Sequence, residues 1–187
     1  MPQPKPDTNF LSYADQSGVV LEHQVIDPAD PENYDDILKI SNCHDVVVRN
    51  CWINTGGGNR EDGIDIMRTS SNVRIENTIV AAGSKYAFTI KGGSYDIALK
   101  DITITRGGSG WEGVDIDLGN YSSTCPDIKT GRVTLDNVRR WDGKPVRIRV
   151  GWAADPVIIG GNCKVLGWQS LALKLYVQIM RKLGGAK

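Results

Sequence analysis

Residues 62–77 read Asp-Gly-Ile-Asp-Ile-Met-Arg-Thr-Ser-Ser-Asn-Val-Arg-Ile-Glu-Asn, and this stretch contains two short strands separated by a turn. In each half, apolar and polar residues alternate, which is typical of a strand that buries one face. The Thr-Ser-Ser-Asn segment between the halves is rich in turn-forming residues. A pair of strands of this kind cannot bury a core alone, so further copies of it are expected along the chain.

Both halves recur along the chain. Copies of the first half lie 24 to 32 residues apart, at 36–40, 62–66, 86–90, 112–116 and 144–148. Copies of the second half end at Asn50, Asn77, Asp101, Asn137 and Asn162. Two columns that share a period near 25 residues predict an all-β fold, a single-stranded right-handed parallel β-helix of about six rungs. The Asn/Asp column is expected to stack at a bend, with Cys51, Thr78, Ile102, Val138 and Cys163 in the inward column that follows it.

The two ends of the chain differ from the repeats. Residues 1–17 are rich in proline and polar side chains and are expected to form a tail or a loose cap. Residues 18–168 form the predicted β-helix, and 169–187 are expected to form an amphipathic capping helix with apolar residues at helical spacing. Docking of this helix to a partner, a second copy or a membrane is the alternative, since Leu173 and Val177 widen its apolar surface.

Composition excludes several classes of function. The chain has 22 Lys+Arg and 22 Asp+Glu, so net charge gives no support for binding nucleic acid. No apolar run is long enough for a membrane span, and no signal peptide is visible at the N-terminus. The four cysteines have no zinc-site spacing and are expected to be buried, reduced thiols, with a Cys43–Cys51 disulfide as the less favoured alternative.

Charged residues gather on the outward face of the first strand family. Because Ile64 and Ile66 face inward, Asp65 and Met67 face outward, and the same parity applies to each copy. The predicted outward rows are Lys39, Asp65, Thr89, Asp115, Arg147 and Ser41, Met67, Lys91, Asp117, Arg149. A third row at the strand entrance is Asp36, Asp62, Tyr86, Glu112, Lys144. Acids therefore occupy the central rungs and bases the last one.

Three interpretations of this face remain open. One is a solvated face with cross-rung ion pairs, which adds little stability. The second is a site for a hard cation such as calcium, with oxygen ligands from Asp62, Asp65, Glu112, Asp115 and Asp117. The third is hydrolysis by two carboxylates, since Asp65 and Asp115 would lie two rungs, or about 9.6 Å, apart.

The strings above resemble the pectate lyase superfamily, which includes polygalacturonases and phage tailspike domains. Residues 61–77 are similar to its Asp-Gly-x-x-Asp-Ile segment followed by a Ser-x-x-Val-x-Ile-x-Asn strand. Residues 144–151 are loosely similar to its Arg-x-Pro-Arg-x-Arg-Phe-Gly run. The resemblance covers roughly residues 18–167. It implies calcium binding by Asp62 and Asp65, and a catalytic or substrate-binding role for Arg147, Arg149 or Lys144.

The resemblance implies a β-helix that binds acidic polysaccharides, in one version a calcium-dependent lyase that cleaves uronic-acid polymers by β-elimination. Lys91 and Tyr86 between the acids and the bases, with Trp111 and Trp152 beside them, are the predicted substrate-binding residues, because indoles suit stacking on sugar rings. An inverting hydrolase of polygalacturonase type is one alternative. A non-catalytic structural or adhesive β-helix, extracellular or part of a virion, is the other, as a monomer or as a homo-oligomer formed through the C-terminal helix.

Overall fold

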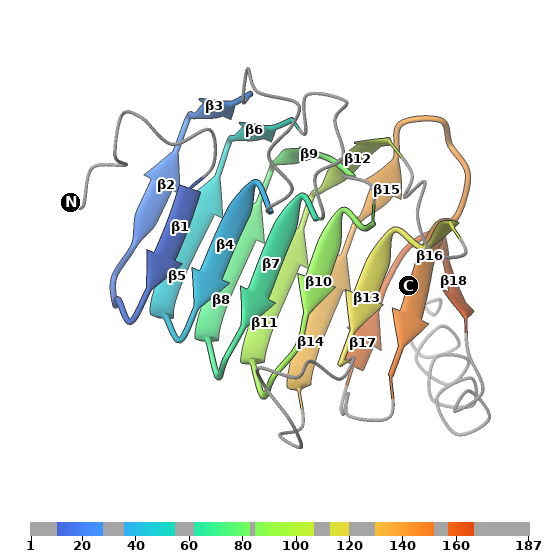
Figure 1. Cartoon of the computed structure of the whole chain (residues 1–187). Helices are drawn as coiled ribbons and strands as arrows, with labels where there is room; N and C mark the ends of the chain where they lie inside the picture. Colours follow the sequence, from blue (N-terminus) through green and yellow to red (C-terminus); the bar gives the residue numbers. More distant parts are fainter. Residues whose placement is uncertain are drawn as a thin grey trace, which may run out of the picture.

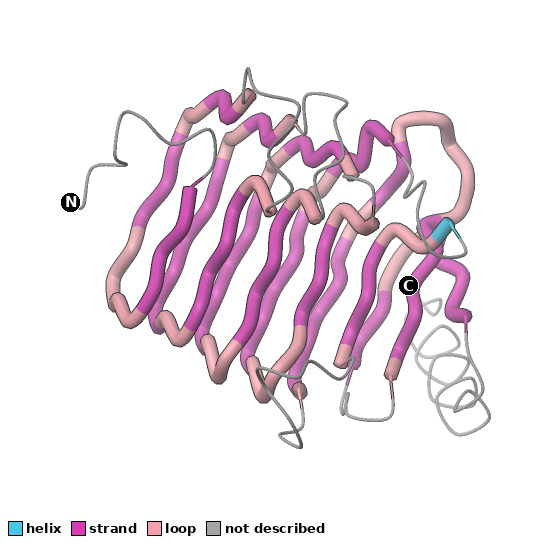
Figure 2. Tube along the Cα trace, in the orientation of Figure 1, coloured by secondary structure: helices cyan, strands magenta, loops and turns pink. Residues whose placement is uncertain are grey.

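The computed structural model describes residues 11–27, 36–54, 62–82, 85–106, 113–119, 130–151 and 157–166. These residues form an all-β parallel solenoid, in which the chain winds through three sheets that run along its length (Figures 1 and 2). No α-helix occurs within the described ranges. The expected C-terminal helix lies outside them, and the handedness and the count of about six rungs stay predictions.

Each sheet is built from one strand of each repeat. Sheet A has seven strands, in the order β1 (Leu11–Ala14), β4 (Leu38–Ser41), β7 (Ile64–Met67), β10 (Phe88–Ile90), β13 (Ile116–Leu118), β16 (Val146–Val150) and β18 (Cys163–Leu166). Sheet B has six, in the order β17 (Val157–Ile159), β14 (Gly131–Asp136), β11 (Tyr95–Lys100), β8 (Ser71–Glu76), β5 (His44–Arg49) and β2 (Val20–Glu22). Sheet C has five, in the order β15 (Arg139–Arg140), β12 (Thr103–Arg106), β9 (Ile79–Ala81), β6 (Trp52–Ile53) and β3 (Val25–Ile26). Strand β1, in a segment that the sequence assigned to the N-terminal tail, pairs with β4 as the first strand of sheet A.

The inward residues of the three sheets form one continuous apolar core. Ile64, Ile66 and Phe88 in sheet A are fully buried, as are Val73 and Ile75 in sheet B. Because like residues stack about 4.8 Å apart, the core is a set of aliphatic columns and not a cluster around one centre. Cys43 and Cys51 are buried free thiols within this core, as the sequence predicted.

Left-handed backbone at the bend between sheets B and C explains the Asn/Asp column. Asn50, Asn77, Asp101 and Asn137 all have φ between 44° and 55°, which Asn and Asp tolerate better than other residues that have a Cβ. The amide of Asn77 donates to Oδ1 of Asn50 at 2.7 Å, and that of Asn137 donates to Oδ1 of Asp101 at 2.6 Å. These bonds tie adjacent turns together at the surface.

Two members of the predicted columns are misplaced. Leu135 pairs with Ile159, so the position after Asn137 in the Asn/Asp column falls to Gly161 (φ 83°) and not to Asn162. Glycine fits this bend because it has no Cβ. Cys163 lies in β18 of sheet A beside Val146 and is therefore not in the column of Cys51.

Charges on the outward face of sheet B alternate in sign from strand to strand. Glu22 pairs with Arg49, Arg49 with Glu76, Glu76 with Lys100, and Lys100 with Asp136. The pair between Arg49 and Glu22 is solvent-exposed, with side-chain exposures of 49% and 31%. Exposed pairs of this kind contribute about 1 kcal/mol or less each. This row of charges therefore adds only a small preference for the observed register.

We predict that Asn77→Ala lowers the free energy of unfolding by about 1–3 kcal/mol, because alanine is strained at this φ and loses the bond to Asn50. Asn77→Gly is the matched control: it loses the same bond but is free of the strain, so its loss is smaller. Urea denaturation measures both. Equal losses for the two variants would contradict a role for left-handed backbone at this bend.

Candidate functional site

The outward row of sheet A consists of Lys39, Asp65, Thr89, Asp117 and Arg149, each paired with the next along the sheet. The predicted row contained Asp115 and Arg147 in place of Asp117 and Arg149, and this assignment was wrong by two residues. Residues 112–116 resemble 62–66, and matching them placed Ile116 beside Ile90, whereas Ile116 pairs with Phe88. A slip of two keeps every side chain on its correct face but changes its neighbours.

The same slip corrects the other two rows. In the second predicted row, Gly119 and not Asp117 is the neighbour of Lys91, because Leu118 pairs with Ile90 and the N–H of Gly119 donates to the carbonyl of Ile90. At the strand entrance, the register brings Val146 to the position that the sequence assigned to Lys144. Glu112, Trp111 and Trp152 lie outside the described residues.

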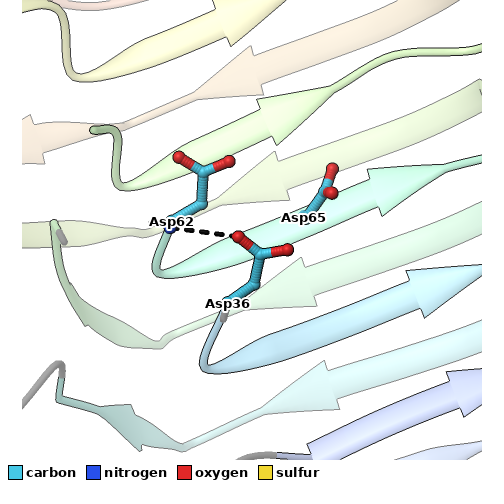
Figure 3. A group of neighbouring side chains, drawn as sticks. All are labelled: Asp36, Asp62 and Asp65. Carbon is cyan, nitrogen blue, oxygen red and sulfur yellow. Dashed lines mark hydrogen bonds between the residues drawn. The ribbon is translucent and has the colours of Figure 1, made fainter. Parts of the chain in front are cut away.

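Three aspartates converge near the start of β7 (Figure 3). Asp36 and Asp62 precede β4 and β7, and Asp65 projects outward from β7, so that one oxygen of each lies within 4.8 Å of the others. The N–H of Asp62 donates to Oδ1 of Asp36 at 3.1 Å, and the N–H of Tyr86 donates to Oδ1 of Asp62 at 3.1 Å. Asp36 and Asp62 therefore each bind the backbone of the following turn.

All three aspartates are buried, at 2–3% exposure, although they project from the outer face of the solenoid. Asp36 was not among the predicted cation ligands, but the structure groups it with Asp62 and Asp65. The signal was present in the sequence, because Asp36 and Asp62 occupy the same position in successive copies of the strand. We call Asp36, Asp62 and Asp65 the acidic cluster.

Two lysines neutralise part of the acidic cluster. Nζ of Lys39 lies 3.2 Å from Oδ2 of Asp36, and Nζ of Lys91 lies 3.0 Å from Oδ2 of Asp65. The other oxygen of Asp65, Oδ1, is buried without a hydrogen-bond partner among the described residues. A buried unpaired oxygen on a charged group is costly, so the cluster retains unused capacity for a proton or a cation.

Burial dominates the protonation of the cluster. It raises the pKa of Asp62 to about 8, with the charge of Asp36 adding to the effect. It also raises the pKa of Asp65 to about 7, against the opposing charge of Lys91. Burial lowers the pKa of Lys91, but the charge of Asp65 and its bond to the ammonium outweigh this and raise the pKa overall. Lys91 therefore stays charged at neutral pH.

Another ion pair with a buried acid lies two strands further along sheet A. Arg149 donates from Nε and Nη2 to the two oxygens of Asp117, both at 2.8 Å. Nη2 also donates to the hydroxyl of Tyr86, and the guanidinium lies 5.2 Å from the centre of the tyrosine ring. The bonds to Asp117 raise the pKa of Arg149 further above its already high value. This arginine is held as a permanent cation.

The remaining predicted site residues lie on neighbouring rows. Asp115 is fully buried, receives the backbone N–H of Arg147 at 2.8 Å and lies 3.3 Å from Nη1 of Arg140. Lys144 is exposed, with its ammonium 3.7 Å from Asp142. The predicted metal ligands thus separate into Asp62 and Asp65 within the acidic cluster and Asp115 and Asp117 with their own arginines. The predicted substrate-binding residues Lys91 and Tyr86 lie between these groups.

The fit of calcium to the cluster is incomplete. Calcium takes six to eight oxygen ligands, and the three aspartates offer suitable hard donors with one unused oxygen on Asp65. Two ammonium groups already contact Oδ2 of Asp36 and of Asp65, and both would repel a dication. Calcium binding by this chain stays a prediction.

The chain matches no family model, no curated protein and no solved structure. The parallel β-solenoid agrees with the fold that the resemblance to the pectate lyase superfamily implies, and membership of that superfamily stays a prediction. Within the described ranges, no helix is long and apolar enough to cross a membrane.

The raised pKa of Asp62 predicts that stability falls as pH rises from about 4 to about 8. Over this range the unfolded state releases a proton that folded Asp62 retains, so the folded state is favoured at low pH. Asp62→Asn should remove much of this dependence, since asparagine still accepts from the N–H of Tyr86 through its side-chain oxygen. Urea denaturation at several pH values measures the effect.

At pH 9 the Asp62→Asn variant should be more stable than the wild type, and below about pH 4, where the carboxyl group is mostly protonated in the folded and the unfolded state, the two should be nearly equal. Asp136→Asn, which removes an exposed carboxylate from sheet B, should leave the pH dependence unchanged. Parallel pH curves for the wild type and Asp62→Asn would show that Asp62 is ionised in the folded protein.

Proposed function

We propose that this chain is a non-catalytic β-helix that binds acidic polysaccharides along the outward face of sheet A. One observation carries the proposal: in each of four ion pairs near this face, the acid is buried and the base is partly exposed. Side-chain exposures, base first, are 26% and 4% for Lys39–Asp36, 18% and 2% for Lys91–Asp65, 15% and 0% for Arg140–Asp115, and 23% and 3% for Arg149–Asp117. A ligand that approaches the face meets ammonium and guanidinium groups, with the carboxylates beneath them.

The spacing of these cations suits an extended polymer. Lys39 and Arg149 are four strands apart in the row, which corresponds to about 19 Å, with the ammonium of Lys91 between them. A uronic-acid polymer carries a carboxylate on each sugar, so several can pair with cations at once. Charge-assisted hydrogen bonds to carboxylates contribute about 1.5–3 kcal/mol each.

The protonation of Asp62 is also compatible with the binding of an anionic ligand. At neutral pH the raised pKa keeps Asp62 largely protonated, which leaves fewer negative charges beneath Lys39 and Lys91. The cluster with its two lysines is then close to neutral, so it does not repel an anion. Sheet B offers no comparable surface, because its charged row alternates in sign.

Two features argue against catalysis at this face. β-Elimination needs a base, and Arg149 is locked in bonds to Asp117 and Tyr86 that hold its proton more tightly. Hydrolysis by two carboxylates also needs one carboxylate that activates a water as general base, whereas Asp117, two strands from Asp65, is bound at both oxygens by Arg149. We therefore limit the proposal to binding.

Calorimetric titration with oligogalacturonate and alginate oligosaccharides tests the proposal, with neutral dextran oligosaccharides as the control ligand. Lys39→Gln should weaken uronate binding by about tenfold to a hundredfold, because one charge-assisted contact is lost. Lys100→Gln on sheet B is the matched control and should bind like the wild type. The absorbance of unsaturated sugar, read on the same mixtures with calcium added, should not rise.

Three results would overturn the proposal. The first is a lack of affinity for every uronate tested, and the second is equal affinity for the neutral sugars. The third is release of unsaturated product, which would replace binding with lyase activity.

A further inference from the structure

We infer that the ammonium groups of Lys39 and Lys91 take the place of a metal ion in the acidic cluster. The folded chain then needs no divalent cation, and replacing Lys91 with methionine converts the cluster into a calcium site. This inference is independent of polysaccharide binding, because it concerns only what balances the charge of the three buried aspartates.

The first support is the position of the two lysines. Lys39 contacts Asp36 at one edge of the acidic cluster, and Lys91 contacts Asp65 at the other, at 3.2 and 3.0 Å. Both lysines belong to the solenoid itself: Lys39 lies within β4, and Lys91 directly follows β10. An ammonium is a compact charge with three donors, so it can balance a carboxylate from a fixed strand as an ion would.

The second support is the use of the aspartate oxygens. Oδ1 of Asp36 and Oδ1 of Asp62 each accept a backbone N–H, and the two ammonium groups contact Oδ2 of Asp36 and Oδ2 of Asp65. At least four of the six carboxylate oxygens therefore already have a donor or a cation among the described residues. A calcium ion would have to share these oxygens and tolerate an ammonium group at about 3 Å from two of them, where like charges repel strongly.

The third support is the unpaired oxygen of Asp65. Its Oδ1 is buried without a hydrogen-bond partner in the described part of the chain, and the Asp65 side chain is only 2% exposed. Removing the ammonium of Lys91 would take away the contact at Oδ2 as well. With Asp62 protonated, the charge of the cluster with its lysines would change from 0 to −1, with two carboxylate oxygens of one buried residue open to a cation.

Melting temperatures in EDTA and in calcium chloride at constant ionic strength test the inference. The wild type should melt at the same temperature in both buffers. Lys91→Met should be less stable than the wild type in EDTA and should gain about 5–10 °C when calcium exceeds its dissociation constant about a hundredfold. Methionine suits the test because it is unbranched, flexible and uncharged, and fills much of the same space.

Two control variants test whether the rise in melting temperature with calcium depends on the acidic cluster. Lys91→Met/Asp65→Asn lacks the unpaired carboxylate and should show no calcium effect, and Lys100→Met on sheet B should behave like the wild type. Calorimetric titration of Lys91→Met with calcium alone should give one site per chain.

Two outcomes would overturn the inference: a wild type stabilised by calcium, or a folded Lys91→Met variant indifferent to it. If Lys91→Met does not fold, Lys39→Met takes its place, because Lys39 is the more exposed of the two lysines. Indifference of that variant to calcium would contradict the inference equally.

Discussion

The parallel register of sheet A is the constraint on which the rest of the structure depends. Backbone hydrogen bonds hold residue 65 beside 89, 89 beside 117 and 117 beside 149, so any side chain on one strand has its chemical neighbours fixed by the next. Because the spacing between strands is only about 4.8 Å, side chains in adjacent positions of one row are in contact. The aliphatic columns of the core and the charged row outside follow from the same stacking.

Stacking buries the carboxylates of this face, which costs free energy, and the neighbouring basic side chains offset that cost. Asp36, Asp62, Asp65 and Asp117 are all buried, and a buried carboxylate is tolerated when it is protonated, paired or hydrogen-bonded. The structure uses all three solutions: a raised pKa at Asp62, ammonium groups at Asp36 and Asp65, and a two-pronged guanidinium at Asp117. The cations that complete these pairs are held toward the solvent. One arrangement therefore accounts for the protonation behaviour, the proposed affinity for acidic polymers and the proposed independence from calcium.

Much of the fold could be predicted from the sequence, because stacked strands leave a periodic record. Alternation within strands predicted the inward face correctly, including the buried Ile64 and Ile66. The reason for a glycine at position 63 is not visible in the sequence. A Cβ there would lie 2.7 Å from the carbonyl oxygen of Ala81 and 2.8 Å from that of Ala87, so the Asp-Gly pair serves the close approach of neighbouring turns. Spacing alone does not reveal such a contact.

The site was harder to predict, because its chemistry depends on neighbours across strands. Matching 112–116 to 62–66 displaced Asp117 and Arg149 by two residues, and the inward pattern could not reveal the error, since both alignments bury the same face. The ion pairs themselves depend on side-chain reach: Lys91, directly after β10, extends back to Asp65 on β7. Sequence columns bring residues to the same position on successive rungs, but they do not show which charges form pairs or which become buried.

Interstrand nuclear Overhauser effects in the labelled protein test the register of sheet A most directly. They should connect the backbone protons around Thr89 with those around Asp117, and those around Asp117 with those around Arg149. Contacts that instead join Thr89 to Asp115 would contradict the register. The pairing of buried acids with outward cations would fall with it.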